Sequence, residues 1–169
     1  HRINYYYQKN EGLSKSINKG IRLAKYEYIA RQDADDISLP KRLEKLVLYL
    51  KSHPDCFLVG SWAQIIKKDN LTNRYLIHPT THTGCIYKLL FDCCFTHTSV
   101  LIKKSIFEEV GFFNEDNSKV PPVDYEMWSR ISKKAKVSNI PEVLVYFREN
   151  PSSISFNKPY LLRSKAATI

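Results

Sequence analysis

The sequence lacks long apolar runs, low-complexity tracts and a secretory signal. A bilayer-spanning helix needs about 20 consecutive apolar residues, and no stretch approaches that length. Disordered chains are poor in apolar side chains, whereas 43% of these residues are apolar, including 11 tyrosines and 8 phenylalanines. We therefore expect a globular, cytoplasmic protein that is soluble or peripheral to a membrane. Since 169 residues suffice for one core and are few for two, we expect a single domain over 1–169.

The four cysteines show neither a CxxC pair nor a spacing typical of zinc ligands; they are Cys56, Cys85, Cys93 and Cys94. Neighbours in sequence such as Cys93 and Cys94 rarely form a disulfide with each other. Reduced thiols in the core of a cytosolic protein fit this pattern best.

The charge balance is basic, with a formal net charge of +9. The lysines are scattered in small clusters and form no recognisable nucleic-acid motif, so we expect no nucleic-acid partner. A nucleotide or an anionic cytoplasmic membrane leaflet would suit this charge. A simply solvated basic surface is the plainer alternative.

Three carboxylates follow a short apolar run in the first third of the chain. Tyr28–Ala30 has the pattern of a buried strand, and Asp33, Asp35 and Asp36 come directly after it. Such close carboxylates repel each other unless a cation lies between them, and Mg²⁺ and Mn²⁺ prefer carboxylate oxygens. We interpret Asp33 and Asp35 as metal ligands at the carboxyl end of a strand, where open α/β sheets bind ligands. On spacing alone, an exposed acidic turn in which Asp36 or Ser38 caps the next helix fits equally well.

The segment before this turn predicts a strand–helix–strand unit. Ile3–Gln8 is a tyrosine-rich strand pattern, and apolar residues at helical spacing follow from Leu13 to Ala24. Together with Tyr28–Ala30 they predict a parallel pair with a right-handed crossover. By pattern alone, Asn18 is a surface amide on this helix. Arg31 is either a surface charge or a countercharge to the acidic turn or to a diphosphate.

The rest of the chain alternates between helical and strand-like patterns. Pro40–Ser52 is an amphipathic helix with a proline in its first turn. The histidines His78 and His82 have no partner at metal spacing and are expected in a polar loop. The pattern also predicts strands at Phe57–Ile66, Arg74–Ile77, Thr96–Ile102, Val137–Ile140 and Val143–Phe147, helices at Ile86–Phe91 and Lys104–Val110, and a polar helix or tail at the end.

A second candidate site lies at the start of a late helix. Two prolines, Pro121 and Pro122, force an extended approach, and Asp124 then begins a helix that carries Trp128 and Ile131 inward. A carboxylate at this position is either an ordinary helix cap or a fixed group that accepts a proton from a substrate hydroxyl. At this spacing Trp128 favours a core position over stacking on a sugar.

Taken in order, these landmarks resemble a known family. The chain is similar to the family-2 class of inverting, nucleotide-sugar-dependent glycosyltransferases through the successive segments NEGLSKSIN, YIARQDADDISLPKRLEK, LVGS, FTHTSVLIKKSIFEEVGFF, VDYEMWSR and YFRENPSSIS. The resemblance covers nearly the whole chain, and DADD followed by D-Y-E-x-W-x-R is more specific than a lone DxD. It implies a GT-A fold, a Rossmann-like α/β domain with a mixed, mostly parallel sheet flanked by helices.

The resemblance implies a role for each matching residue. Asp33 and Asp35 would form the DxD that holds Mn²⁺ or Mg²⁺ and the diphosphate of a UDP-sugar donor, and Asp124 would be the catalytic base. The family's late motif often reads Y-R-x-H; here Asn150 replaces the His, and its carbonyl oxygen would ligate the metal more weakly. The other implied residues are Asn18 and Arg31 on the donor side, and Asp36, His97, Thr98 and Ser99 on the acceptor side.

The implied activity is sugar transfer with inversion to a glycan or lipid-linked glycan, in surface polysaccharide or lipopolysaccharide synthesis at the inner membrane face. Two features typical of the family, an opening apolar strand and a D-D-G-S strand, are missing, and the chain starts at His1 without an initiator Met. We therefore expect the carboxyl-terminal part of a catalytic domain, truncated at its amino terminus. The alternatives are a catalytically incompetent fragment or scaffold of the same fold and a basic nucleic-acid-binding module.

Overall fold

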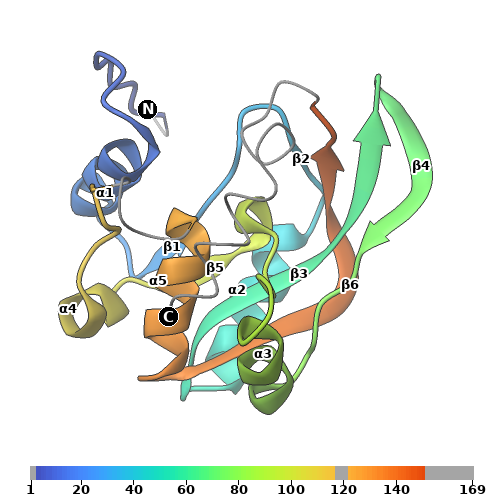
Figure 1. Cartoon of the computed structure of the whole chain (residues 1–169). Coiled ribbons are helices and arrows are strands. Elements are labelled where there is room, and N and C mark those ends of the chain that lie inside the picture. Colours follow the sequence, from blue (N-terminus) through green and yellow to red (C-terminus); the bar gives the residue numbers. More distant parts are fainter. Residues whose placement is uncertain (1–2, 117–121, 151–169) are drawn as a thin grey trace.

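The computed structural model describes residues 3–116 and 122–150, and Figure 1 shows the arrangement of its helices and strands. The predicted closing helix or tail, residues 151–169, and Pro121 lie outside the described residues. None of the described helices is long and apolar enough to cross a membrane. The elements are α1 (Leu13–Leu23), β1 (Tyr28–Ala30), β2 (Ile37–Ser38), α2 (Arg42–Ser52), β3 (Cys56–Lys67), β4 (Asn70–Leu76), α3 (His82–Leu89), the 3₁₀ turn η1 (His97–Ser99), β5 (Leu101–Lys103), α4 (Ile106–Val110), α5 (Val123–Ser132) and β6 (Lys136–Arg148).

The six strands form one mixed sheet with the order β1-β5-β3-β6-β2, and β4 pairs with β3 beside this path. Within the described residues, β3 and β6 form the one parallel pair, and the other pairs are antiparallel. The α/β fold is as expected, but the expectation of a mostly parallel sheet is wrong. Two parallel strands need a long connection between them, and among the paired strands only β3 and β6 are joined by a connection of this kind, which contains helices. By contrast, β3 and β4 are joined by a hairpin through Lys68 and Asp69 and are therefore antiparallel.

The strand expected at Ile3–Gln8 is absent. This segment is irregular, and three of its tyrosines, Tyr5, Tyr6 and Tyr7, are exposed. The expected parallel pair across α1 is therefore wrong, because the partner of β1 is β5, which runs antiparallel to it. A tyrosine-rich run forms a strand only when a neighbouring strand satisfies its backbone, and no strand of the described residues lies against this one.

The sheet is covered on both faces, which gives two apolar clusters. On one face, Leu46 and Leu50 of α2 pack with Val59 of β3. On the other face, Trp128 of α5 packs in a cluster that includes Leu58, the neighbour of Val59. The side chains of successive residues in a strand point to opposite faces of the sheet, so β3 contributes residues to both clusters. Figure 1 shows α2 on one side of the sheet and α3 and α5 on the other. The core position predicted for Trp128 is confirmed, with 0% of its surface exposed.

Two differences from the expected elements bear on the site. Ser38, which on spacing alone could cap the next helix, lies with Ile37 in the short strand β2, which pairs with Tyr146 and Val145 of β6. The two strands expected from Val137 onward are one strand, β6, with a register shift at Pro141 and Glu142. A proline cannot donate to the ladder, so the pattern looks broken although the strand continues. The four cysteines are free thiols, as expected.

Candidate active site

The acidic turn, residues 31–36, connects β1 to β2 and is anchored to the segment before β5. The backbone N–H of Arg31 donates to the carbonyl of Val100 over 3.2 Å, which extends the β1–β5 pairing. The backbone N–H of Asp33 donates to the Thr98 hydroxyl over 3.0 Å. Thr98 is fully buried in η1, so the acidic turn is fixed against a rigid part of the molecule.

A buried arginine holds the turn from the α2 side. Arg42 is 2% exposed, and its guanidinium donates to the carbonyl of Arg31 over 2.7 Å and to the side-chain oxygen of Gln32 over 2.9 Å. The Gln32 amide in turn donates to the carbonyls of Asp33 and Asp36, over 3.0 and 3.1 Å. Burial lowers the pKa of Arg42 to about 10, which still leaves it a cation at neutral pH.

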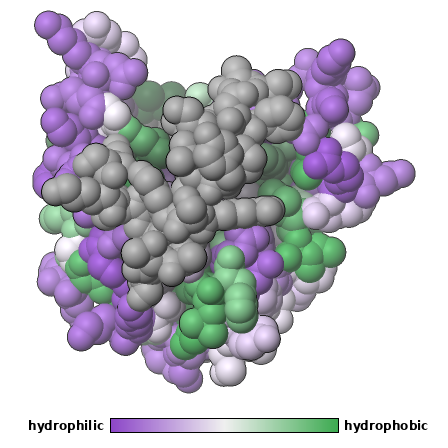
Figure 2. Space-filling view, viewed as in Figure 1, coloured by the Kyte–Doolittle hydropathy of each residue, from purple (hydrophilic) through white to green (hydrophobic). Residues whose placement is uncertain are grey.

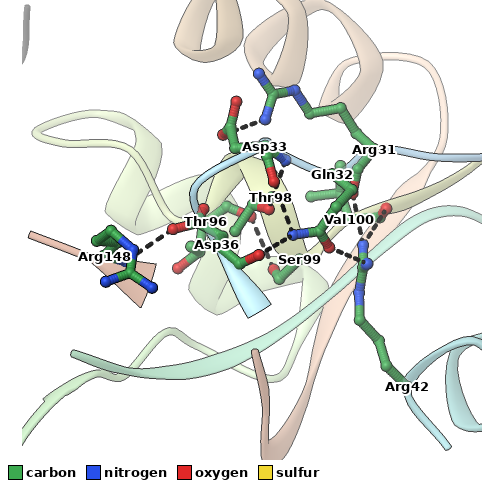
Figure 3. A network of polar contacts seen from close by, with 10 residues as sticks. All are labelled: Arg31, Gln32, Asp33, Asp36, Arg42, Thr96, Thr98, Ser99, Val100 and Arg148. Atoms are coloured by element: carbon green, nitrogen blue, oxygen red, sulfur yellow. Dashed lines mark hydrogen bonds and ion pairs between the residues drawn. The ribbon is translucent and has the colours of Figure 1, made fainter. Parts of the chain in front are cut away.

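Arg148, near the end of β6, holds the turn from the opposite side (Figure 3). Its backbone N–H donates to a carboxylate oxygen of Asp36 over 2.7 Å, and its Nε donates to the carbonyl of Asp35 over 2.7 Å. The guanidinium also pairs with Asp69 over 2.6 Å. Burial raises the pKa of Asp36, and the charges of Asp33 and Asp35 add to this effect. The Asp36 carboxylate is thus used to fasten the turn to β6.

The other two carboxylates of the turn differ in their surroundings. Asp33 forms an ion pair with Arg31, whose side chain is largely buried. Asp35 is exposed, and Asn150 is exposed two residues beyond Arg148. Among the described residues no group of three His, Cys, Asp or Glu side chains could hold a metal ion. The donor set still fits a hard divalent cation, because Mg²⁺ is commonly bound through one or two carboxylates, with water and substrate phosphates supplying the remaining oxygens.

Asp124 lies within electrostatic reach of the acidic turn, although it stands 91 positions after Asp33 in the sequence. Asp124 lies in the first turn of α5, after Pro122, and its carboxylate accepts a hydrogen bond from the Tyr125 N–H over 2.9 Å. Burial raises its pKa, while the Arg31 charge lowers it and the Asp33 charge raises it. Charges shift a pKa in this way only over a short range, so Arg31 and Asp33 lie within electrostatic reach of Asp124.

The residues of η1 expected on the acceptor side contact other protein groups, and their acceptor role stays a prediction. The hydroxyl of Ser99 is buried between the carbonyl of Thr96, to which it donates over 2.8 Å, and the N–H of Ser61, from which it accepts over 3.2 Å. The His97 ring lies against Phe113 and Trp128, with ring centroids 6.2 and 5.6 Å apart. Burial and the nearby Arg31 charge lower its pKa to about 3, so His97 is neutral at physiological pH.

Asn18 is buried, not on the surface as its pattern alone indicated. Its amide exchanges two hydrogen bonds with the backbone of Phe113, over 2.8 and 2.9 Å, and donates to Glu115 over 2.9 Å. The amide therefore ties α1 to the segment that precedes α5. Its contacts within the described residues are with protein groups, so its place on the donor side stays a prediction.

Sequence reasoning missed Gln32, Arg42 and Arg148 as parts of the site. In the predicted amphipathic helix Pro40–Ser52, Arg42 falls on the polar face, where charged residues normally meet water. No local pattern distinguishes it from Lys45 or Lys51 on the same helix. Its burial depends on carbonyl groups that only the folded chain brings to it.

Comparison with known proteins identifies glycosyltransferases as relatives of this chain. The family model described as Glycosyl transferase family 2 matches residues 1–111. An uncharacterized glycosyltransferase of Haemophilus influenzae is 31% identical over 87% of this chain and 54% of its own length. The O-antigen biosynthesis glycosyltransferase WbnJ of Escherichia coli is 32% identical over 87% of this chain and 57% of its own length. The chain therefore spans about half the length of the curated relatives it matches.

Two solved structures show the same fold. Staphylococcus aureus TarS 1-349 in complex with UDP-GlcNAc has a TM-score of 0.60 at 13% identity, covering 85% of this chain and 40% of the TarS 1-349 chain. The mannosyltransferase PcManGT of Pyrobaculum calidifontis, in complex with GDP-Man and Mn²⁺, has a TM-score of 0.56 at 18% identity, covering 90% of this chain and 40% of its own. At these identities the likeness concerns the fold, which is that of GT-A glycosyltransferases.

Proposed function

The chain belongs to glycosyltransferase family 2, and we propose that its acidic turn and Asp124 form the site that transfers a sugar from a nucleotide-diphosphate donor to an acceptor hydroxyl with inversion. The observation that carries the proposal is that the charges of the ion-paired Arg31 and Asp33 act on the carboxylate of Asp124. A carboxylate able to act as a base would then lie within reach of groups able to hold a diphosphate.

The carboxylates of Asp33 and Asp35, with the amide oxygen of Asn150, would hold a divalent cation, Mn²⁺ or Mg²⁺. When bound, that cation neutralises the charge that develops on the departing diphosphate. The Mn²⁺ in the Pyrobaculum mannosyltransferase supports this assignment. Arg31 balances Asp33 in the structure and would add positive charge on the diphosphate side.

Asp124 would remove the proton from the acceptor hydroxyl. As the hydroxyl oxygen forms its bond to the anomeric carbon, the bond from that carbon to the diphosphate oxygen breaks on the opposite side, so the configuration inverts in one displacement. A general base works best when its pKa lies closer to the working pH than that of an ordinary carboxyl group. The burial that raises the pKa of Asp124 acts in this direction.

The relatives support a proposal for the substrate class. We infer a UDP-sugar donor, as in the TarS complex, and an acceptor that is a glycan or a lipid-linked glycan of a surface polysaccharide, in line with the O-antigen role of WbnJ. The GDP-Man in the Pyrobaculum complex makes a GDP-sugar the alternative donor.

Calorimetric titration of UDP in the presence of Mn²⁺ tests the donor site. We expect binding that is lost with EDTA and in Asp35→Ala, because both remove the metal bridge to the diphosphate. Asp55→Ala is the matched control, because Asp55 is an exposed carboxylate paired with Lys136 outside the turn. A folded chain that binds no UDP, or that loses binding equally in both variants, would contradict the assignment.

A second candidate, a family member that binds a partner without catalysing transfer, is favoured by one observation. Asn150 is uncharged at the position where the family often carries a His ligand. If UDP binds without dependence on Mn²⁺ and no donor sugar is released in the presence of acceptors, this reading replaces the catalytic one.

A further inference from the structure

Helix α3 and the two residues after it present an exposed apolar face. Cys85 and Leu89 point into the core, whereas Tyr87, Leu90 and Phe91 are 66, 67 and 69% exposed. Ile86 is 39% exposed and completes the set, and the rings of Tyr87 and Phe91 pack edge to face at 5.4 Å. We refer to Ile86, Tyr87, Leu90 and Phe91 as the α3 face. In Figure 2 it corresponds to the green area over α3 in the lower part of the view.

The α3 face borders the candidate base. The hydroxyl of Tyr125, the residue after Asp124, donates a hydrogen bond to the carbonyl of Leu89 at the end of α3. Cys93, two residues beyond Phe91, feels the charge of Asp124, which adds to the effect of burial in raising the pKa of the Cys93 thiol. The end of the α3 face is therefore adjacent to the start of α5, where Asp124 lies.

Lysines lie on α3 and near its start. Lys88 lies on the helix and pairs with Asp92 over 3.7 Å. At the other end of α3, the N–H of Val137 donates to the ring nitrogen Nδ1 of His82 over 3.3 Å, so α3 begins beside the start of β6. The exposed residues Lys133 and Lys134 come just before β6. An apolar patch on a helix whose first residue lies near a pair of exposed lysines complements an anionic lipid surface.

We propose that the α3 face is a membrane-contact surface that rests on an anionic lipid bilayer. The aromatic and aliphatic side chains would enter the interface, and Lys133 and Lys134 would meet the phosphate headgroups. This surface would turn Asp124 toward the hydroxyl of a lipid-linked acceptor, and that second part rests on the proposed function. A second copy of the chain is a poorer occupant, because four such side chains offer on the order of 500 Å², less than the roughly 800 Å² per partner of a stable interface.

Co-sedimentation with vesicles tests the surface. We expect the chain to bind phosphatidylcholine vesicles that contain phosphatidylglycerol and to bind pure phosphatidylcholine vesicles much less. The double variant Tyr87→Ser, Phe91→Ser should partition at least about tenfold less. Replacing Lys133 and Lys134 by Glu should weaken binding about fivefold or more for each lysine, and added salt should do the same.

The control is Leu43→Ser, Leu48→Ser on α2, whose leucines are 51 and 58% exposed on the opposite side of the sheet. Unchanged vesicle binding in this control supports the proposal. Equal losses in both double variants, or no vesicle binding by the original chain, overturn it. A dimer in sedimentation velocity that disappears in Tyr87→Ser, Phe91→Ser also overturns it, in favour of self-association.

Titrating UDP with Mn²⁺ into the Tyr87→Ser, Phe91→Ser variant separates the two proposals. Retained UDP binding with lost vesicle binding supports the membrane surface. Absence of UDP binding in the original chain contradicts the donor site, while the vesicle comparison still decides the α3 face.

Discussion

The guanidinium of Arg42 donates a 2.7 Å hydrogen bond to the backbone carbonyl of Arg31, the residue that opens the acidic turn. Arg42 makes a second contact through Gln32, whose amide holds the carbonyls of Asp33 and Asp36. A charged side chain that is 2% exposed thus sets the path of the backbone that carries the candidate metal ligands. A change at Arg42 should therefore affect both the stability of the chain and the candidate donor site.

Arg42→Lys should weaken both the fold and the donor site. Lysine keeps the charge but cannot reach two acceptors with a planar fork, and a buried carbonyl left without a donor costs roughly 1–3 kcal/mol. We expect a loss of about 2 kcal/mol in the free energy of unfolding, together with weaker Mn²⁺-dependent UDP binding. Urea denaturation and calorimetry measure the two effects. Arg74→Lys is the control, because Arg74 is exposed and its ion pair with Glu149 survives the change.

Asn18→Ala should destabilise the chain without any ligand present. The change leaves the buried N–H and carbonyl of Phe113 without partners, so we expect a loss of roughly 2–4 kcal/mol in the free energy of unfolding. Gln8→Ala removes an exposed amide that bonds Ser16 and should cost less than about 0.5 kcal/mol. If Asn18→Ala leaves the urea midpoint unchanged, the hydrogen bonds between Asn18 and Phe113 do not contribute to the free energy of unfolding, and the prediction is wrong.

Asp124→Asn should stabilise the chain at neutral pH. Burial raises the pKa of Asp124, so between its ordinary and raised values the folded state binds more protons than the unfolded state. The free energy of unfolding therefore falls as the pH rises through that window. Asparagine removes this titration, so the stability difference between variant and original should grow from about pH 3 to about pH 7. Urea denaturation at several pH values checks the sign; a difference that shrinks over this range would contradict the burial effect.

Much of the fold follows from local pattern. The helix α2, the buried strand β3 and the inward position of Trp128 were predicted because each shows its periodicity in a short window of sequence. The family resemblance was likewise correct, since ordered short motifs survive even where local structure is ambiguous. The acidic turn was also located, because its three carboxylates lie within four consecutive residues.

The features of the fold that the sequence did not predict depend on residues that are distant from each other in the sequence. The direction of strand pairing is set by which strand arrives beside which, and that is why β1 pairs antiparallel with β5 although a helix precedes it. The bond from Asp33 to Thr98 spans 65 residues, and the amide of Asn18 meets Phe113 across 95 residues. A window of sequence contains no trace of such contacts, so a buried Asn18 looks the same as an exposed one.

Sugar transfer by the Asp124→Asn variant tests the central claim most directly. The measurement is release of UDP from a UDP-sugar in the presence of an acceptor, made alongside calorimetric titration of UDP with Mn²⁺ on the same preparation. Since the variant keeps the shape of the side chain but cannot take up the proton, we expect release to fall by at least about 100-fold, with the UDP dissociation constant unchanged. Loss of UDP binding and release together, or retention of both, would contradict the assignment of Asp124 as the base of this site.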